Sequence, residues 1–167
     1  MSPLEPPDSL HLLAAQGWLE LGNPTEAALE LEKLSLPHRN HPDVRAIEWE
    51  IDRAAKRFER LFEHARALTQ VRPSQSDSWV KLAQSFYWSG RYEEAYECSR
   101  GVVDQFPKDY VLHYDLACYA CLLGKLDEAK IGLVRAFKLA PDPKRAKLYA
   151  LEDPDLERIW PEIRGLG

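Results

Sequence analysis

The sequence predicts an all-α fold built from helical hairpins, and three observations lead to this prediction. Apolar residues recur every three or four positions over most of the chain, which is the spacing of one face of a helix. Glycine and proline interrupt these stretches at regular intervals. The segments 79–107 and 113–141 repeat one pattern with a step of 34 residues. A period of that length, carrying helical patterns, is typical of stacked pairs of helices.

The step of 34 residues relates the two segments position by position. The matched pairs are Leu82 and Leu116, Ala83 and Ala117, Gly90 and Gly124, Glu94 and Glu128, Ala95 and Ala129, and Pro107 and Pro141. The same step taken backwards from Gly90 leads to Lys56 and then to Gly22, with no insertion needed. We therefore predict four helical hairpins, at 8–41, 42–75, 76–109 and 110–143.

Several short signals predict where the helices begin and end. Asp8 or Ser9 is expected to cap the first helix, and Gly22 to end it. Asn23 and Pro24 favour the start of the second helix, as cap and first helical residue. No glycine follows the third helix, so the stretch 53–58 either fuses the third and fourth helices or joins them by a tight turn without glycine.

The two ends of the chain differ from the repeats. Residues 1–7 contain three prolines and little to bury, so a flexible N-terminus is expected. Residues 144–167 are expected to form capping helices, with a start at Asp153-Pro154-Asp155 and a kink or end at Pro161. Leu156, Ile159, Trp160 and Ile163 would cover the last hairpin. Two alternatives stay open: this segment could fill the groove of its own chain, or pair with another chain.

The repeats resemble a known family. Trp79, Leu82, Ala83 and Phe86, followed by Gly90, Tyr92, Ala95 and Pro107, look like a tetratricopeptide repeat (TPR). The likeness extends over about 8–143. It is weakest in the second repeat, where Trp49, Lys56 and Leu61 replace the usual small residue, glycine and alanine. The tail, together with the run from Tyr114 to Tyr119, is also similar to short bacterial TPR proteins of unassigned function. The resemblance implies a right-handed α-solenoid.

Composition excludes some classes of function. The net charge of −5 argues against a nucleic-acid-binding protein, which usually carries a basic face. No stretch reaches the roughly 18 apolar residues of a membrane-spanning helix, and the N-terminus does not read as a secretory signal. Three cysteines without the spacing of a disulfide framework fit a reducing compartment. A cytoplasmic location with no membrane contact is expected.

The TPR resemblance also implies a binding surface. In that family the first helix of each repeat lines a concave groove that holds peptides. By position, the expected groove residues are Glu50, Arg53, Lys81, Gln84, Tyr87, Trp88, Tyr114, Asp115 and Cys118, with Gln16, Leu19, Glu20 and Ala46 beside them. Tyr87, Trp88 and Tyr114 are aromatic residues left over once the core positions are filled, and such residues often anchor interfaces. Packing on a neighbouring helix is the alternative.

Nothing in the sequence predicts catalysis. Cys118 and Cys121 are three residues apart on one side of a helix, but a redox motif belongs in a βαβ unit and a zinc site needs about four ligands. Small, partly buried core residues are the expected role of both cysteines. No phosphate-binding loop, serine-hydrolase motif or metalloprotease motif occurs. We therefore predict a protein that is not an enzyme and has no catalytic residues, metal or cofactor.

The predicted function is that of a scaffold that binds a peptide or a protein surface in the groove, as a monomer or a homodimer. The alternative is a TPR-type cytoplasmic chaperone of secreted subunits, and a thiol or metal protein using Cys118 and Cys121 ranks below it. Such chaperones often dimerise through their N-terminal helices. This alternative ranks second because the first repeat shows no apolar seam that would be left exposed.

Overall fold

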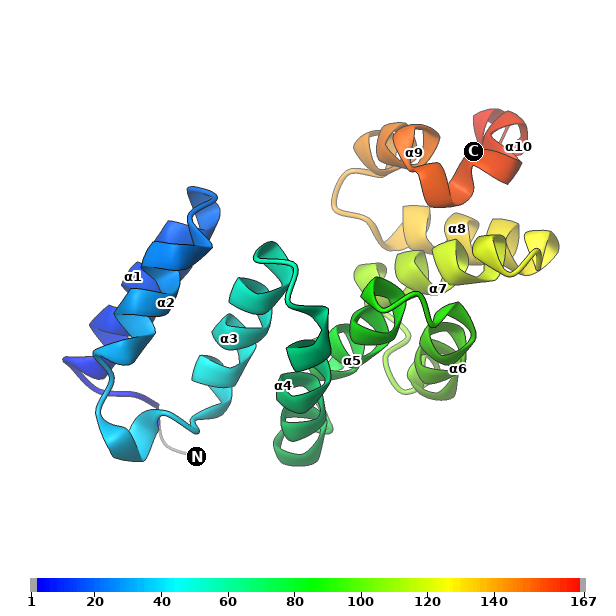
Figure 1. The fold of residues 1–167 in the computed structure, drawn as a ribbon. Helices are drawn as coiled ribbons and strands as arrows, with labels where there is room; N and C mark the ends of the chain where they lie inside the picture. The colour runs from blue at the N-terminus through cyan, green and yellow to red at the C-terminus, as the bar shows by residue number, and fades with distance from the viewer. Residues whose placement is uncertain (1–2, 166–167) are drawn as a thin grey trace. The chain divides into compact units, whose positions relative to one another are not determined.

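The computed structural model describes residues 3–165, and all of their regular structure is helical (Figure 1), which confirms the all-α prediction. The elements are α1 (Asp8–Glu20), α2 (Pro24–Glu32), η1 (Leu36–His38), α3 (Pro42–Ala54), α4 (Phe58–Val71), α5 (Ser76–Trp88), α6 (Tyr92–Val102), α7 (Tyr110–Leu122), α8 (Leu126–Leu139), α9 (Pro143–Glu152), η2 (Pro154–Ile159) and α10 (Trp160–Gly165); η1 and η2 are 3₁₀ helices.

The chain forms two compact units, and the boundary between them in the sequence falls within α5. Unit 1 runs to Ser85 and unit 2 begins at Phe86. In unit 1, α1 packs on α2 and α3 packs on α4, while α3 also contacts the first pair. In unit 2, α7 packs on α8 and α6 contacts α7. Helices such as α4 and α8 bury one apolar face against their partners, as the three- and four-residue spacing predicts, whereas α7 is buried on several sides, since Ala117 to Cys121 are all buried.

The period of 34 residues reappears in the backbone geometry. Gly22, Gly90 and Gly124 have φ angles of 74°, 73° and 76°, and Lys56 has a φ of 58°. These are left-handed values, which end a helix and which only glycine adopts without a steric penalty. Lys56 therefore forms the same turn as the three glycines. The tight turn between α3 and α4 is confirmed, and the fused helix is ruled out.

Replacing Lys56 with glycine should stabilise the chain by about 0.5–1 kcal/mol, because relief of the left-handed Cβ clash exceeds the added freedom of the unfolded chain. Urea denaturation followed by circular dichroism measures this change. Lys56→Ala serves as the control, since alanine keeps the clash and should bring no gain. A less stable glycine variant would contradict the prediction.

The start of α1 differs from the expected cap. Pro7 occupies the cap position without a side-chain hydrogen bond, and Asp8 is buried at 4% exposure instead. Its carboxylate accepts hydrogen bonds from the Ser35 amide at 3.0 Å and the Ser35 hydroxyl at 2.5 Å, and contacts Nδ1 of His38. The hydrogen bonds from Ser35, with that of His38, lower the pKa of Asp8 to about 2. Asp8 thus ties the start of the first hairpin to its end.

The other predicted starts agree better with the structure. Asn23 Oδ1 accepts the Glu26 amide at 3.2 Å, and Pro24 is the first residue of α2. Asp153 Oδ1 accepts the Asp155 amide at 3.0 Å, although the helix that comes next is the 3₁₀ helix η2. The chain changes from η2 to α10 at Trp160, directly before Pro161.

The outer face of α1 is more apolar than the sequence indicated. Leu10, Leu13 and Leu21 are 60%, 65% and 76% exposed. The expectation that the first repeat has no exposed apolar seam is therefore wrong: Leu10 and Leu13 lie on α1, Leu21 directly follows it, and all three are exposed. None of the described helices combines the length and apolarity that crossing a bilayer requires.

Candidate functional site

Unit 1 contains a hollow of about 380 Å³ lined by residues of α1, α3 and α5. These are the first helices of the three hairpins that begin within unit 1. Leu19, Ala46, Ile47 and Ala54 give the hollow an apolar part, and Gln16, Glu20, Glu50, Arg53 and Lys81 give it a polar wall. The structure thus brings together in one concavity seven residues that the resemblance assigned to the groove by position. Whether they bind a partner stays a prediction.

The polar wall is held by ion pairs centred on Glu50. Arg53 donates from Nε and Nη2 to Glu50 Oε2 at 3.1 and 3.0 Å. Lys81 Nζ donates to Glu50 Oε1 at 3.0 Å and to Asp77 Oδ1 at 3.0 Å. The Glu50 carboxylate lies between the charged groups of Arg53 and Lys81. These ion pairs restrict the rotation of the Arg53 and Lys81 side chains into solvent. The wall is therefore fixed before any partner arrives, which lowers the entropy lost on binding.

Trp49 lies beside this wall and supports it. Its side chain is 1% exposed and packs with Leu61, Ala65 and Leu82. Lys81 Nζ is 5.0 Å and Arg53 Cζ 5.7 Å from the centre of the indole ring, which is within the range of a cation–π contact. Trp49 Nε1 donates to the Ser85 hydroxyl at 2.9 Å. Tetratricopeptide repeats usually have a small residue at this position. Here a tryptophan is accommodated by a buried hydroxyl and two cations.

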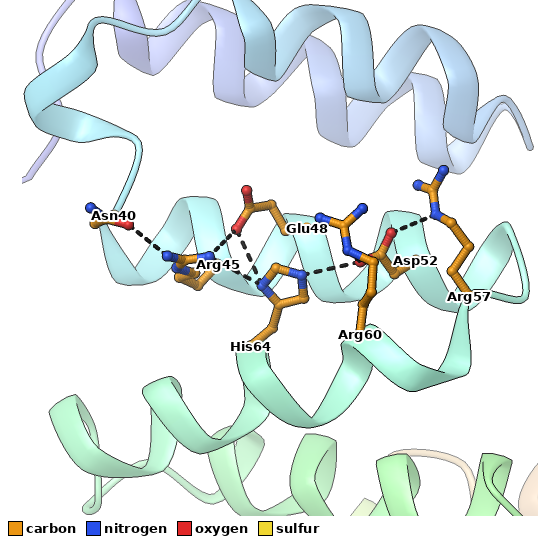
Figure 2. Close-up of polar contacts among 7 residues, drawn as sticks. All are labelled: Asn40, Arg45, Glu48, Asp52, Arg57, Arg60 and His64. Carbon is orange, nitrogen blue, oxygen red and sulfur yellow. Dashed lines mark hydrogen bonds and ion pairs between the residues drawn. The ribbon is translucent and has the colours of Figure 1, made fainter.

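A second polar cluster lies on α3 and α4 (Figure 2), and sequence reasoning missed it. His64, 2% exposed, lies between two carboxylates, with Nδ1 3.2 Å from Glu48 and Nε2 3.1 Å from Asp52. Asp52, also 2% exposed, accepts from Arg57 Nε at 2.7 Å and pairs with Arg60 Nε at 3.3 Å. The sequence did contain a signal for this cluster. Glu48 and Asp52 are four residues apart on α3, and the basic residues Arg57 and Arg60 lie around the start of α4.

The electrostatics of this cluster favour the charged form of Glu48. Burial raises the pKa of Glu48, but the hydrogen bond and charge of His64, with Arg45, bring it below its ordinary value. Arg45 also donates to Glu48 at 3.1 Å and to Asn40 Oδ1 at 2.5 Å. Every charge in the cluster has an opposite partner within the cluster itself. The cluster therefore serves to join α3 to α4.

In unit 2 the corresponding face of α7 is covered by the end of the chain. After α9 the segment η2 turns back and packs on α7 (Figure 1). Tyr114 donates its hydroxyl to Asp153 Oδ2 at 2.9 Å, and the Cys118 thiol donates to the same oxygen at 3.7 Å. Tyr87 forms a hydrogen bond with Asp155. Three of the expected groove residues thus contact the chain's own C-terminal segment.

This covering is well packed. Leu156, Ile159 and Ile163 are 0% exposed, as residues that cap a hairpin should be. Trp88, the remaining aromatic, is 39% exposed and meets Tyr87 edge-on at a centroid distance of 5.0 Å. Gln84 is half-buried in unit 1, and Asp115 is half-buried on α7. Of the predicted groove residues, Glu50, Arg53 and Lys81 thus line the hollow of unit 1, and Tyr87, Tyr114 and Cys118 contact the C-terminal segment in unit 2.

The thiols lie in surroundings that suppress reactivity. Burial, and then the Asp153 carboxylate, raises the pKa of Cys118 well above its ordinary value. Burial also raises the pKa of Cys121, and that of Cys98 to about 11. A raised pKa keeps a thiol protonated and poorly nucleophilic. Within residues 3–165, no three His, Cys, Asp or Glu side chains are grouped in a way that could hold a metal ion.

Comparison with known proteins supports the fold class. A solved structure titled "MamA RS-1 ArsTM double mutant" superposes with a TM-score of 0.67 and 14% sequence identity, over 80% of this chain and 75% of that one. MamA is a TPR-type protein. At that identity the likeness shows a fold of TPR-like helical hairpins and nothing more specific. No protein family profile matches the chain, and no curated protein matches it.

Proposed function

We propose that this protein is an interaction module that holds a peptide or protein surface in the hollow of unit 1. The observation that carries the proposal is the hollow itself, with an apolar part and a fixed polar wall on three first helices. Concave sites with an apolar lining and a few oriented polar groups are the usual form of binding sites. The TPR-like fold supports a partner that is a protein. We include no catalytic role, cofactor or metal in the proposal.

The docking surface that we propose is narrower than the one expected from the sequence. Glu50, Arg53 and Lys81 belong to it, with Glu20 and Ala46 as neighbours in the hollow. Tyr114 and Cys118 are left out, because their polar atoms are already bonded to Asp153. A partner that formed hydrogen bonds with the Tyr114 hydroxyl or the Cys118 thiol would first have to displace Asp153.

Ala46→Arg should weaken binding at least about tenfold, because the long cationic side chain occupies the hollow and meets Arg53 and Lys81. The ligands would be peptides selected from a random display library on the immobilised full chain, and the dissociation constants would be measured by fluorescence polarisation. Ala55→Arg is the matched control, since Ala55 comes directly after the same helix but lies outside the hollow. Selected peptides that bind the Ala46→Arg and unmodified chains equally would refute the docking site.

One observation favours a second candidate function, the chaperone of secreted subunits. The exposed leucines of α1 form an apolar strip on the N-terminal helix, where such chaperones often dimerise. The two candidate functions assign different roles to this strip. A chaperone would use it to form a dimer, whereas the scaffold needs no dimer. Light scattering of the full chain separates them: a stable dimer that is lost in Leu13→Glu supports the chaperone, and a monomer supports the scaffold.

A further inference from the structure

Unit 2 contains a hollow of its own, which includes Asp153, the residue that accepts hydrogen bonds from Tyr114 and Cys118. Tyr110 and Tyr114 of α7, Tyr149 and Glu152 of α9, and Asp153 line about 470 Å³. We call it the tyrosine hollow. The rings of Tyr110 and Tyr114 lie one helical turn apart with centroids 5.8 Å from each other. Tyr149 comes from a helix that the sequence places far from α7, so only the folded chain assembles the three rings.

The hydrogen-bond donors that contact the Asp153 carboxylate in the tyrosine hollow are all neutral. Asp153 Oδ2 accepts from the Tyr114 hydroxyl and the Cys118 thiol, and Oδ1 accepts from the Asp155 amide. Among residues 3–165, neither Asp153 nor Glu152 has a lysine, arginine or histidine nitrogen within ion-pair distance. Within the described residues, the two carboxylates therefore form no ion pair, and the cation that the hollow shows is Arg145, which contacts Tyr149 at its edge.

The Asp153 charge contributes to the raised pKa of Tyr114, while the pKa of Tyr110 is raised by other groups. Burial raises the pKa of Tyr110, and the nearby Cys118 and Asp115 raise it further. The pKa of Tyr114 is raised by burial, and then by Cys118 and Asp153. The side chains of Tyr110 and Tyr114 therefore stay neutral at ordinary pH. Their ring faces carry a negative electrostatic potential and lie beside carboxylates. Both features attract a cation and repel an anion.

At the edge of the tyrosine hollow, a cation of the chain itself already contacts a tyrosine ring. Arg145 Cζ lies 5.4 Å from the centre of the Tyr149 ring, and Arg145 Nε and Nη2 donate to the Tyr149 hydroxyl at 3.1 and 2.8 Å. A guanidinium is thus compatible with the wall of the hollow. Tyr149 is 52% exposed, so its ring is accessible from solvent.

We propose that the tyrosine hollow binds a basic side chain, arginine or lysine, of a protein partner. The argument is charge complementarity: three tyrosine rings and two carboxylates without a cationic partner surround a space open to solvent. An arginine can stack on the rings while its donors reach Glu152 and Asp153, which a neutral side chain of the same shape cannot match. This site is separate from the hollow of unit 1, and neither proposal requires the other.

The test uses the full chain and two blocked peptides, one with a single arginine between glycines and one with citrulline in its place. Citrulline keeps the shape of arginine and removes the charge. Titration followed by NMR should give saturable shifts of the Tyr110, Tyr114 and Tyr149 ring signals with the arginine peptide, and little or none with the citrulline peptide. Binding should weaken as salt is added.

Variants locate the site. Glu152→Gln should weaken binding of the arginine peptide roughly two- to fivefold, the size expected for an exposed ion pair. Glu157→Gln makes the same change on an exposed residue of η2 outside the hollow, and should leave the dissociation constant unchanged. Ala46→Arg in unit 1 should also leave it unchanged, which separates this proposal from the proposed function. Equal binding of both peptides, equal effects of both glutamine variants, or no saturable shift would overturn the proposal.

Discussion

Replacing Trp49 with alanine should lower the free energy of unfolding of unit 1 by about 3–5 kcal/mol, the range observed when a buried tryptophan is truncated. The indole is 1% exposed and fills the space among Phe58, Leu61, Ala65 and Leu82. Alanine leaves a cavity there and removes the ring on which Lys81 and Arg53 rest. The loss should appear as a lower urea midpoint and as faster amide exchange in α3 and α4.

Trp88→Ala is the matched control for this experiment. Trp88 is 39% exposed, so the same truncation removes fewer packed atoms and should cost no more than about 1.5 kcal/mol. Trp49→Phe separates packing from hydrogen bonding, because phenylalanine keeps most of the volume but cannot donate to Ser85. Equal costs for Trp49→Ala and Trp88→Ala would show that Trp49 does not hold unit 1 together.

Replacing Asp52 with leucine should cost about 1–3 kcal/mol, as expected when a buried polar group, here Nε2 of His64, loses its hydrogen-bond partner. The largest part of this loss falls on His64, which is 2% exposed and would keep its position without the carboxylate at Nε2 (Figure 2). Arg57 and Arg60 lose the same carboxylate, but their side chains are 46% and 56% exposed and water can solvate them. Urea denaturation of the single variants measures the cost.

A double-mutant cycle tests the coupling directly. Changing His64 to leucine in the Asp52→Leu chain removes the group that would be left unpaired, so the double variant should be more stable than the Asp52→Leu single variant. Asp77→Leu is a suitable control, because Asp77 also pairs with a cation but is 64% exposed and should cost less than about 1 kcal/mol. Additive effects of the two cluster substitutions would show that Asp52 and His64 do not depend on each other.

Much of the fold can be predicted from local sequence signals. The glycines at 22, 90 and 124 need only their own backbone to end a helix, and Asn23 needs only the amide of Glu26 to begin one. The apolar spacing selects the buried face of each helix without reference to distant residues. Position within the repeat also placed Glu50, Arg53 and Lys81 on first helices, and these line the hollow of unit 1.

The sequence by itself determined the helices, many of their ends and their 34-residue period, because hydrogen bonds and side-chain spacing within a few residues decide those features. The tertiary structure decided which distant segments come together: Asp153 with Tyr114 and Cys118, the buried Asp52 with His64, and Tyr149 with Tyr110 around one hollow. Such contacts form where the free energy of packing and charge pairing exceeds the entropy of closing the chain, and no periodic pattern encodes that balance.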